Sequence, residues 1–182
     1  MTLEHVHAVY AQADVLYRAE EVEAALDRMA AEITRVLKDS NPLVIGVMTG
    51  GMIPAGRILP RLDFPLEIDY LHATRYCGET RGGKLHWIAR PQTPLRDRVV
   101  LIVDDILDEG LTLAAILEEC RAEGAKAVYS AVLVEKLHDR KAKGAHADFV
   151  GLQVVDRYVF GYGMDYKGYL RNAPGIYAVK GM

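Results

Sequence analysis

Short apolar runs that alternate with helical patterns are the feature that most constrains the fold of this chain. The run LVIGVM (Leu43–Met48) follows an amphipathic helical pattern over Glu21–Leu37. The run VVLIV (Val99–Val103) precedes a second helical pattern, which begins near Thr112. Strands that are apolar throughout and are connected through helices form mostly parallel sheets with both faces covered. The sequence therefore predicts an α/β fold in which helices flank a mostly parallel, twisted sheet.

Further elements extend this pattern along the chain. A short helix interrupted by prolines is expected over Ile53–Leu62, and a polar, glycine-rich stretch over Cys77–Gly83 predicts a mobile loop. Additional strands are expected over Leu66–Tyr76, residues 84–90, Val128–Val134, Phe149–Val155 and Ile176–Val179. Neither an internal repeat nor a linker divides the sequence, so residues 1–182 are expected to form one domain.

Charge and composition narrow the classes of partner. The net charge is −3 and no dense block of Lys or Arg is present, which argues against nucleic acid as a partner. The first residues lack a basic segment followed by an apolar run, and no apolar stretch is long enough to span a bilayer. We therefore expect a cytoplasmic protein with no membrane partner. Cys77 and Cys120 lack the spacing of a metal or redox motif and are expected to be free thiols.

The segment VVLIVDDILDEGLTL (Val99–Leu113) gathers four carboxylates between a strand and a helix. The amides of residues 109–112 begin the helix and are suited to holding a phosphate group. Carboxylates repel phosphate, so Asp104, Asp105 and Asp108 fit other tasks: accepting from sugar hydroxyls, holding Mg²⁺ or taking a proton. Phosphate, sugar and metal together indicate a phosphorylated ribose as the ligand.

These acids have two other interpretations. Acidic residues often cap the ends of strands and helices without any chemical role, and this alternative stays open. An apolar strand ending in aspartate also occurs in nucleoside triphosphatases, which require a P-loop. The nearest candidate, GMIPAGRI (Gly51–Ile58), has Arg57 in place of the lysine and Ile58 in place of the Ser/Thr metal ligand. The P-loop interpretation therefore fails at both chemical positions.

Two motifs carry a resemblance to a known family. VVLIVDDILDEGLTL resembles the phosphoribosyl pyrophosphate signature of type I phosphoribosyltransferases, and DFVGLQVVDRYVFGYGMDYKGYLRN (Asp148–Asn172) resembles the purine-binding region of hypoxanthine-guanine phosphoribosyltransferases. The resemblance runs from about Leu43 to Val179. It implies the type I fold with a small hood and a flexible active-site loop, and a homodimer or homotetramer. It also implies a Mg²⁺-dependent purine salvage enzyme that acts on a purine base and phosphoribosyl pyrophosphate.

The same resemblance implies roles for the acidic segment. Asp104 and Asp105 would face the ribose hydroxyls and the hydrated Mg²⁺. Asp108 would stand near purine N7 as the general base and so be the catalytic residue. The 5′-phosphate would be wrapped by Glu109, Gly110, Leu111 and Thr112.

The carboxy-terminal half supplies the expected purine site. Lys136 matches the lysine that reads the purine O6, Tyr158 matches the aromatic residue that stacks on the base, and Val159 offers backbone groups to the purine edge. Asp165 corresponds to a metal-binding acid beside the purine. Arg171 corresponds to an arginine that contacts pyrophosphate.

Two loops complete the expected site, and two residues of the site, Thr49 and Glu109, differ from those usual in the family. Thr49 and Gly50 resemble the pyrophosphate loop, where a non-proline cis peptide can occur, although several family members have lysine where this chain has Thr49. Arg75 and Tyr76 match the start of the flexible loop that closes over the reaction. Glu109 stands where a small hydroxyl residue is usual, and we expect its side chain to turn outward.

Two other functions are compatible with the same sequence features. One is a nucleotide-sensing regulator on the same fold that binds RNA or DNA, which would favour a basic surface and could dispense with Asp108. The other is a phosphoribosyltransferase that prefers xanthine, or that acts on a non-purine base. The latter differs from the main hypothesis only in the contacts near Val159 and Asp165.

Overall fold

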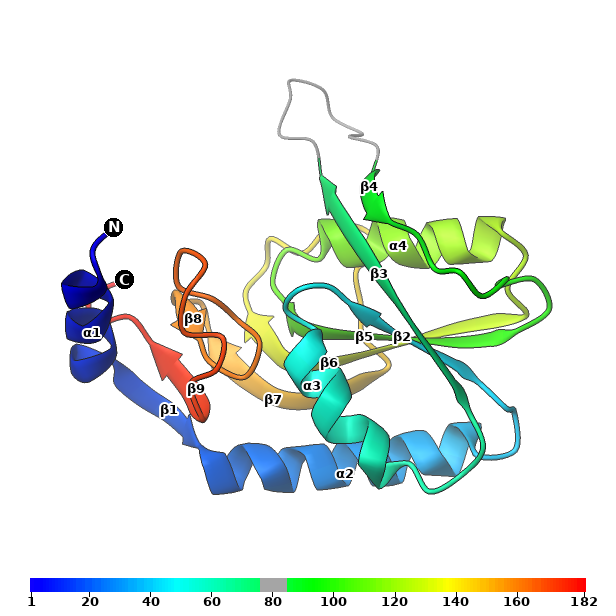
Figure 1. Cartoon of the computed structure of the whole chain (residues 1–182), viewed down its shortest axis with the longest axis horizontal. Coiled ribbons are helices and arrows are strands. Elements are labelled where there is room, and N and C mark those ends of the chain that lie inside the picture. The colour runs from blue at the N-terminus through cyan, green and yellow to red at the C-terminus, as the bar shows by residue number, and fades with distance from the viewer. Residues whose placement is uncertain (76–84) are drawn as a thin grey trace.

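The centre of the protein is a six-stranded sheet with the order β4-β3-β2-β5-β6-β7 (Figure 1). The computed structural model describes residues 1–75 and 85–182. Neighbouring strands pair in parallel except β3 and β4, which are antiparallel. The strands are β2 (Leu43–Val47), β3 (Glu67–Arg75), β4 (Leu85–Ala89), β5 (Val99–Leu107), β6 (Ala127–Leu137) and β7 (Phe149–Val155). The predicted mostly parallel α/β sheet is confirmed.

Helices cover both faces of this sheet, as the uniformly apolar strands require. Helices α2 (Ala19–Leu37) and α3 (Met52–Ile58) lie on one face, and α4 (Leu111–Ala122) lies on the other (Figure 1). Along β5, Leu101 belongs to the apolar cluster that includes α2 and α3, whereas Val100 and Ile102 belong to the cluster that includes α4. Burying each such side chain stabilises the fold by about 1.5–3 kcal/mol. Alternate residues of one strand thus fill two cores.

A small second sheet forms the expected hood beside β7. Strands β1 (Asp14–Arg18), β9 (Gly175–Ala178) and β8 (Val159–Phe160) pair antiparallel in the order β1-β9-β8. Helix α1 (Leu3–Gln12) lies beside this sheet (Figure 1). Tyr10 of α1 meets Phe160 and Tyr177 edge to face. Strand β9 matches the strand expected over Ile176–Val179, whereas α1 and β1 have no counterpart among the predicted elements. Both are short, and β1 exists because it pairs with a strand from the other end of the chain.

Two strands extend beyond their predicted limits, and one predicted helix is divided in two. Strand β5 continues through Asp104 and Asp105 to Leu107, because its pairing with β6 continues to the partners Leu107 and Glu135. Strand β6 likewise includes Lys136, which was expected to follow it. The helix predicted over Ile53–Leu62 is divided into α3 and a 3-10 turn, η1 (Leu59–Arg61). Backbone pairing, which is indifferent to side-chain polarity, sets the strand ends.

The loop predicted over Cys77–Gly83 lies entirely outside the described residues, as does Tyr76. On either side of this segment, β3 and β4 pair with each other, with Arg75 opposite Leu85. Cys120 is a free, buried thiol on α4, and burial raises its pKa to about 11.

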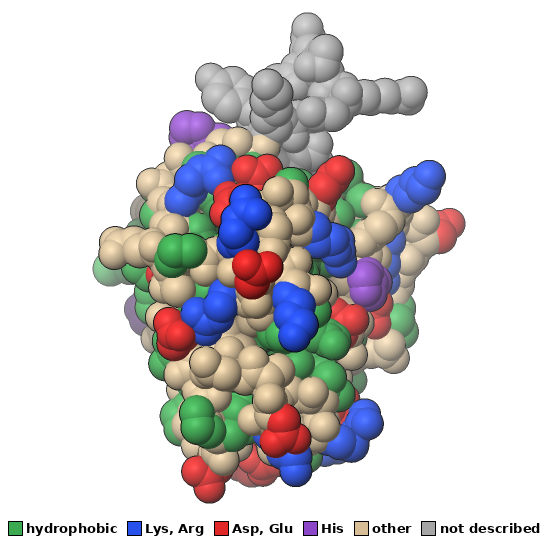
Figure 2. All heavy atoms as spheres, turned by 90° about the vertical axis from the view of Figure 1, so that its right-hand side faces the viewer, with side chains coloured by type: hydrophobic (Ala, Val, Ile, Leu, Met, Phe, Trp, Pro, Cys, Tyr) green, Lys and Arg blue, Asp and Glu red, His purple; other side chains and the backbone are tan. Residues whose placement is uncertain are grey.

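Within residues 1–75 and 85–182, none of the helices is both long and apolar enough to cross a bilayer. Figure 2 shows one face of the molecule, on which basic and acidic side chains are interspersed.

Candidate active site

The carboxyl ends of β2 and β5 open into a cavity of about 640 Å³. Its lining combines the turn after β2, the ends of β3 and β5, the start of α4, one residue after β6 and two residues from the hood. Predicted site residues in this lining are Thr49, Gly50, Asp104, Asp105, Asp108, Glu109, Gly110, Leu111, Thr112, Asp165 and Arg171. The fold therefore brings together, from three separate segments, residues that the sequence analysis assigned to the ribose, phosphate and metal. This location is typical of ligand sites in open α/β sheets.

Asp104 and Asp105 place two carboxylates side by side at the end of β5. Asp105 is 8% exposed, and its backbone N–H donates to Oδ1 of Asp104 over 2.9 Å. Burial, together with the neighbouring charge of Asp105, raises the pKa of Asp104 well above its usual value. Burial also raises the pKa of Asp105, although the nearby Arg171 partly offsets this. The pair is a site where negative charge is concentrated and poorly solvated.

Arg171 connects the hood to these acids. Its guanidinium lies 2.8 Å from Oδ1 of Asp165 and 3.7 Å from Oδ2 of Asp105, and it donates to the carbonyl oxygen of Gly163 over 2.5 Å. Oδ2 of Asp165 in turn accepts from the backbone N–H of Gly168 over 2.7 Å. These contacts hold Arg171 and Asp165 at the rim of the same cavity.

This donor set fits a magnesium ion. When ionised, the carboxylates of Asp104, Asp105 and Asp165 carry three negative charges, and Arg171 supplies one positive charge, in ion pairs with Asp105 and Asp165. Carboxylate oxygens are the protein ligands that Mg²⁺ prefers, and it commonly takes one or two of them. The surplus of negative charge therefore suits a bound divalent cation.

Glycines allow the turn after β2 to approach the end of β5. A Cβ atom on Gly50 would lie 2.0 Å from Oδ2 of Asp105, and a Cβ atom on Gly163 would lie 2.2 Å from the carbonyl oxygen of Gly50. Gly163 also has a φ of 110°, a conformation that L side chains rarely adopt. The peptide bond between Met48 and Thr49 is cis. The turn that was expected to hold pyrophosphate thus contains the non-proline cis peptide that the resemblance allowed for.

The start of α4 lines the larger cavity with residues 110–113. Gly110 is the N-cap residue with a φ of 73°, and a Cβ atom there would lie 2.5 Å from the Cβ atom of Ala145. The first N–H groups of a helix have no intrahelical acceptor and carry the positive end of the helix dipole, so they bind anions. Glu109 is exposed, and its carbonyl oxygen accepts from the N–H of Ala142 over 2.7 Å. The outward orientation of the Glu109 side chain stays a prediction.

A smaller cavity of about 250 Å³ adjoins the first and shares some of its lining. The shared residues include Asp105, Asp108 and Asp165. The rest of its lining includes the three remaining residues that were assigned to the purine: Lys136, Tyr158 and Val159. The expected sugar and purine residues therefore surround two connected spaces, with Asp108 at the boundary between them.

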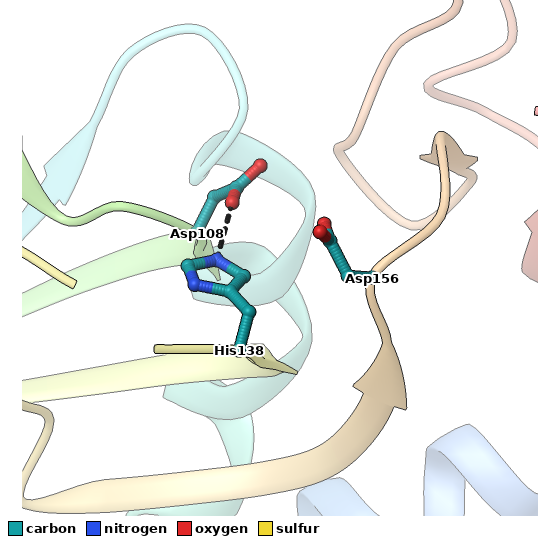
Figure 3. Close-up of side chains that lie close together, drawn as sticks. All are labelled: Asp108, His138 and Asp156. Atoms are coloured by element: carbon teal, nitrogen blue, oxygen red, sulfur yellow. Dashed lines mark hydrogen bonds and ion pairs between the residues drawn. The ribbon is translucent and has the colours of Figure 1, made fainter. Parts of the chain in front are cut away.

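Asp108 is held by two donors, Lys136 and His138, and Figure 3 shows the contact with His138. Nζ of Lys136 donates to Oδ2 over 2.8 Å, and Nε2 of His138 lies 2.8 Å from Oδ1. Partial burial opposes ionisation of Asp108, but the hydrogen bonds from Lys136 and His138 lower its pKa below the usual value. Asp108 is therefore a carboxylate at neutral pH, which a general base requires.

Several residues of this region escaped the sequence analysis. His72 and Thr74 of β3 line the larger cavity, as does Arg140 after β6. His138 and Asp156 lie near Asp108 (Figure 3). Their segments contain no motif, so the sequence offered no signal for them. Of the two loop residues that were predicted, Arg75 ends β3 and Tyr76 lies outside the described residues, so their roles stay predictions.

Comparison with known proteins supports the same family. The profile of the phosphoribosyl transferase domain matches residues 12–167. A hypoxanthine-guanine phosphoribosyltransferase of Bacillus subtilis is 36% identical, with 91% of this chain and 92% of that protein aligned. A hypoxanthine-guanine-xanthine phosphoribosyltransferase of Tritrichomonas foetus is 34% identical, with 91% of each protein aligned.

Solved structures agree with these relatives. A crystal structure of a hypoxanthine phosphoribosyltransferase from Staphylococcus aureus superposes with a TM-score of 0.86 at 28% identity, covering 92% of this chain and 91% of that one. A hypoxanthine-guanine-xanthine phosphoribosyltransferase structure superposes with a TM-score of 0.78 at 32% identity, covering 92% of this chain and 94% of that one. Because the relatives align with nearly the whole chain at more than 30% identity, the protein belongs to the hypoxanthine-guanine phosphoribosyltransferase family.

Proposed function

We propose that the protein transfers the 5-phosphoribosyl group of phosphoribosyl pyrophosphate to hypoxanthine or guanine in purine salvage. The products are inosine or guanosine monophosphate and pyrophosphate. The observation that carries this proposal is the pair of adjoining cavities, which meet at Asp105, Asp108 and Asp165. One cavity has the amides and acids that suit a sugar phosphate, and the other has the aromatic and cationic groups that suit a 6-oxopurine.

The reaction is a displacement at C1′ of the ribose. The C1′–O bond to pyrophosphate breaks, its electron pair leaves with pyrophosphate, and purine N9 forms the new bond to C1′. The sugar becomes positively charged as the bond breaks, and the carboxylates of Asp104 and Asp105 stabilise that charge. Asp108, near N7, accepts the proton that the base loses. Positioning of the two substrates contributes much of the rate enhancement.

The two substrates are held by different kinds of group. The amides of residues 109–112 and the Thr112 hydroxyl bind the 5′-phosphate, and Thr49, Gly50 and Arg171 contact the pyrophosphate. Lys136 donates to the purine O6, Tyr158 stacks on the base and Val159 pairs with its edge through the backbone. Asp104, Asp105 and Asp165 would hold Mg²⁺, which supplies charge neutralisation for the leaving pyrophosphate.

We also propose that the chain functions as a homodimer or homotetramer in the cytoplasm. An apolar surface supports self-association: Met52, Ile68 and Tyr70 are exposed and line a cavity close to Met48. Large exposed apolar side chains that cluster together mark interaction sites. Analytical ultracentrifugation of the purified protein tests this proposal, and a monomer at micromolar concentration would contradict it.

A spectrophotometric assay tests the proposed reaction. Hypoxanthine, guanine, xanthine and adenine are each supplied with phosphoribosyl pyrophosphate and Mg²⁺. We expect turnover of hypoxanthine, guanine or both, and none of adenine, because its 6-amino group cannot accept from Lys136. Xanthine is included because the name of the Tritrichomonas foetus relative includes it. The absence of turnover with all four bases would contradict the proposed function.

A further inference from the structure

A buried histidine, which is not among the described residues that line the two cavities, holds the carboxylate of Asp108. His138 lies just beyond the end of β6, and its side chain is 4% exposed, against 41% for Asp108. Nε2 of His138 lies 2.8 Å from Oδ1 of Asp108 (Figure 3). The described residues that line the two cavities include Asp108 but not His138. His138 therefore contacts the expected general base without facing the space in which the substrates would bind.

The hydrogen bonds assign the tautomer of this histidine. The backbone N–H of Arg140 donates to Nδ1 of His138 over 3.1 Å. Because Nδ1 accepts this bond, it carries no proton, and in the neutral ring the proton is on Nε2. Nε2 consequently donates to Oδ1 of Asp108, while Lys136 donates to Oδ2. Each oxygen of the carboxylate has its own donor.

A metal site is the other interpretation of this cluster. Ligand atoms of Asp108, His138 and Asp156 lie within 4.8 Å of one another. However, Arg140 lies 2.7 Å from Asp156, and Lys136 lies 2.8 Å from Asp108 and 3.8 Å from Asp156. Two cations thus balance two carboxylates among the described side chains, which leaves no surplus charge to attract a metal ion. The arrangement is a hydrogen-bonded network, and His138 acts in it as a donor.

We propose that His138 is a positioning residue that fixes the orientation of the Asp108 carboxylate during phosphoribosyl transfer, an inference that rests on the proposed function. Lys136 has two tasks in that function, since it also donates to the purine O6. When Lys136 turns toward the base, His138 is the donor that continues to hold Asp108. A general base must stay within hydrogen-bond reach of the proton it removes, and a second donor maintains that geometry.

Two substitutions separate the two hydrogen bonds of His138. In His138→Asn, the side-chain oxygen can replace Nδ1 as the acceptor for the Arg140 N–H, but the side chain is too short to donate to Asp108. In His138→Gln, the amide nitrogen can replace Nε2 and donate to Asp108. We expect kcat to fall about tenfold or more in His138→Asn with the KM for phosphoribosyl pyrophosphate unchanged, and to be largely retained in His138→Gln. His7→Asn, on the exposed surface of α1, is the matched control.

The outcomes distinguish this inference from the function on which it rests. If the wild type is active and His138→Asn has the same kcat, or if both variants lose kcat equally, the positioning role is wrong and the function stands. An inactive wild type would overturn both. A ¹⁵N NMR spectrum of the histidine rings provides a measurement that is independent of turnover. We expect the signal that disappears in His138→Gln to be that of a neutral ring protonated at Nε2, and a ring protonated at Nδ1 would overturn the proposal.

Discussion

The ammonium group of Lys136 lies 2.8 Å from Oδ2 of Asp108, so the residue expected to read the purine oxygen forms an ion pair with the expected general base. The Lys136 side chain is only 12% exposed. Recognition of the base and ionisation of Asp108 therefore depend on the same charge. A substitution at either residue should change the behaviour of the other.

Lys136→Ala is expected to affect both purine binding and the pH profile. Loss of a charged donor to the purine should raise the KM for hypoxanthine roughly tenfold or more, while the KM for phosphoribosyl pyrophosphate stays nearly unchanged. Lys136 also lowers the pKa of Asp108, so its removal should raise that pKa. Activity that needs ionised Asp108 is lost as the pH falls through this pKa, and the loss should therefore begin at a higher pH in the variant. Lys143→Ala, at an exposed position, is the control; an equal loss of affinity for both substrates would contradict the assignment of Lys136.

Asp108→Asn is expected to reduce turnover far more than substrate affinity. An amide cannot accept the proton from the base, and general-base catalysis typically contributes about 100-fold or more. Steady-state kinetics with hypoxanthine should show a large decrease in kcat with a small change in either KM. An unchanged kcat would show that Asp108 is not the base.

Gly50→Ala should disable the pyrophosphate turn. The new Cβ atom would lie 2.0 Å from the carboxylate of Asp105, so the turn or the end of β5 must move. A displacement of about 1 Å at a reacting centre can cost roughly a hundredfold in rate, and kcat/KM for phosphoribosyl pyrophosphate should fall accordingly. Gly56→Ala is the control, because the added methyl group meets no atom within 4 Å. This variant should keep full activity. It should also gain up to about 1 kcal/mol of stability, because Gly56 lies in the helix α3 and alanine favours helices more than glycine does. Similar kinetics in the two variants would be inconsistent with the close approach of Gly50 and Asp105.

Magnesium should stabilise the folded protein through the acids at the end of β5. A ligand that binds only the folded state at 100 times its Kd adds about 2.7 kcal/mol, so the unfolding temperature of the wild type should rise as Mg²⁺ is titrated. Asp104→Asn removes one of two adjacent like charges, and it should raise the unfolding temperature without Mg²⁺ while greatly reducing the response to Mg²⁺. Chelation of Mg²⁺ should abolish turnover. An equal thermal response in the wild type and the variant would exclude Asp104 from the metal site.

Glu23 should make an acid-sensitive contribution to stability. It joins α2 to α3 and the hood, because its carboxylate accepts from Arg57, Arg61 and the Tyr162 hydroxyl. Partial burial opposes ionisation, but these donors lower the pKa of Glu23 to about 2, from an ordinary value of 4.5. A pKa that is lower in the folded state stabilises the protein above the ordinary value, and this contribution is lost as the pH falls from 4.5 toward 2.

Glu23→Gln should therefore lower the free energy of unfolding at pH 7 by about 1.5–3 kcal/mol, the range for hydrogen bonds to charged groups. The difference from the wild type should shrink as the pH falls below 4.5. Urea titrations at pH 7 and pH 3 measure both effects. Glu32→Gln, at an exposed position of α2, should leave the stability nearly unchanged at either pH. A difference between wild type and Glu23→Gln that does not change with pH would contradict the depressed pKa.

Site residues could be predicted from the sequence only where they lie in a segment that contains a motif. The acids from Asp104 to Glu109 and the start of α4 follow one another along the chain, so their order alone indicated a phosphate and sugar site. Lys136 and Arg171 were placed only through a resemblance to a family. His138 belongs to a segment without a motif, and its contact with Asp108 depends on how the ends of β5 and β6 lie beside each other.

The sequence by itself determined the class of fold, because runs such as Leu43–Met48 and Val99–Val103 are apolar on both faces and can be buried only in a sheet with helices on each side. It also determined the chemistry available at the end of β5. Only the tertiary structure decided which strands build the hood, where Asp14 of β1 pairs with Ala178 of β9, and the network around Asp108. Such contacts join residues that are distant in sequence, and their formation depends on the geometry of the whole fold rather than on any local preference.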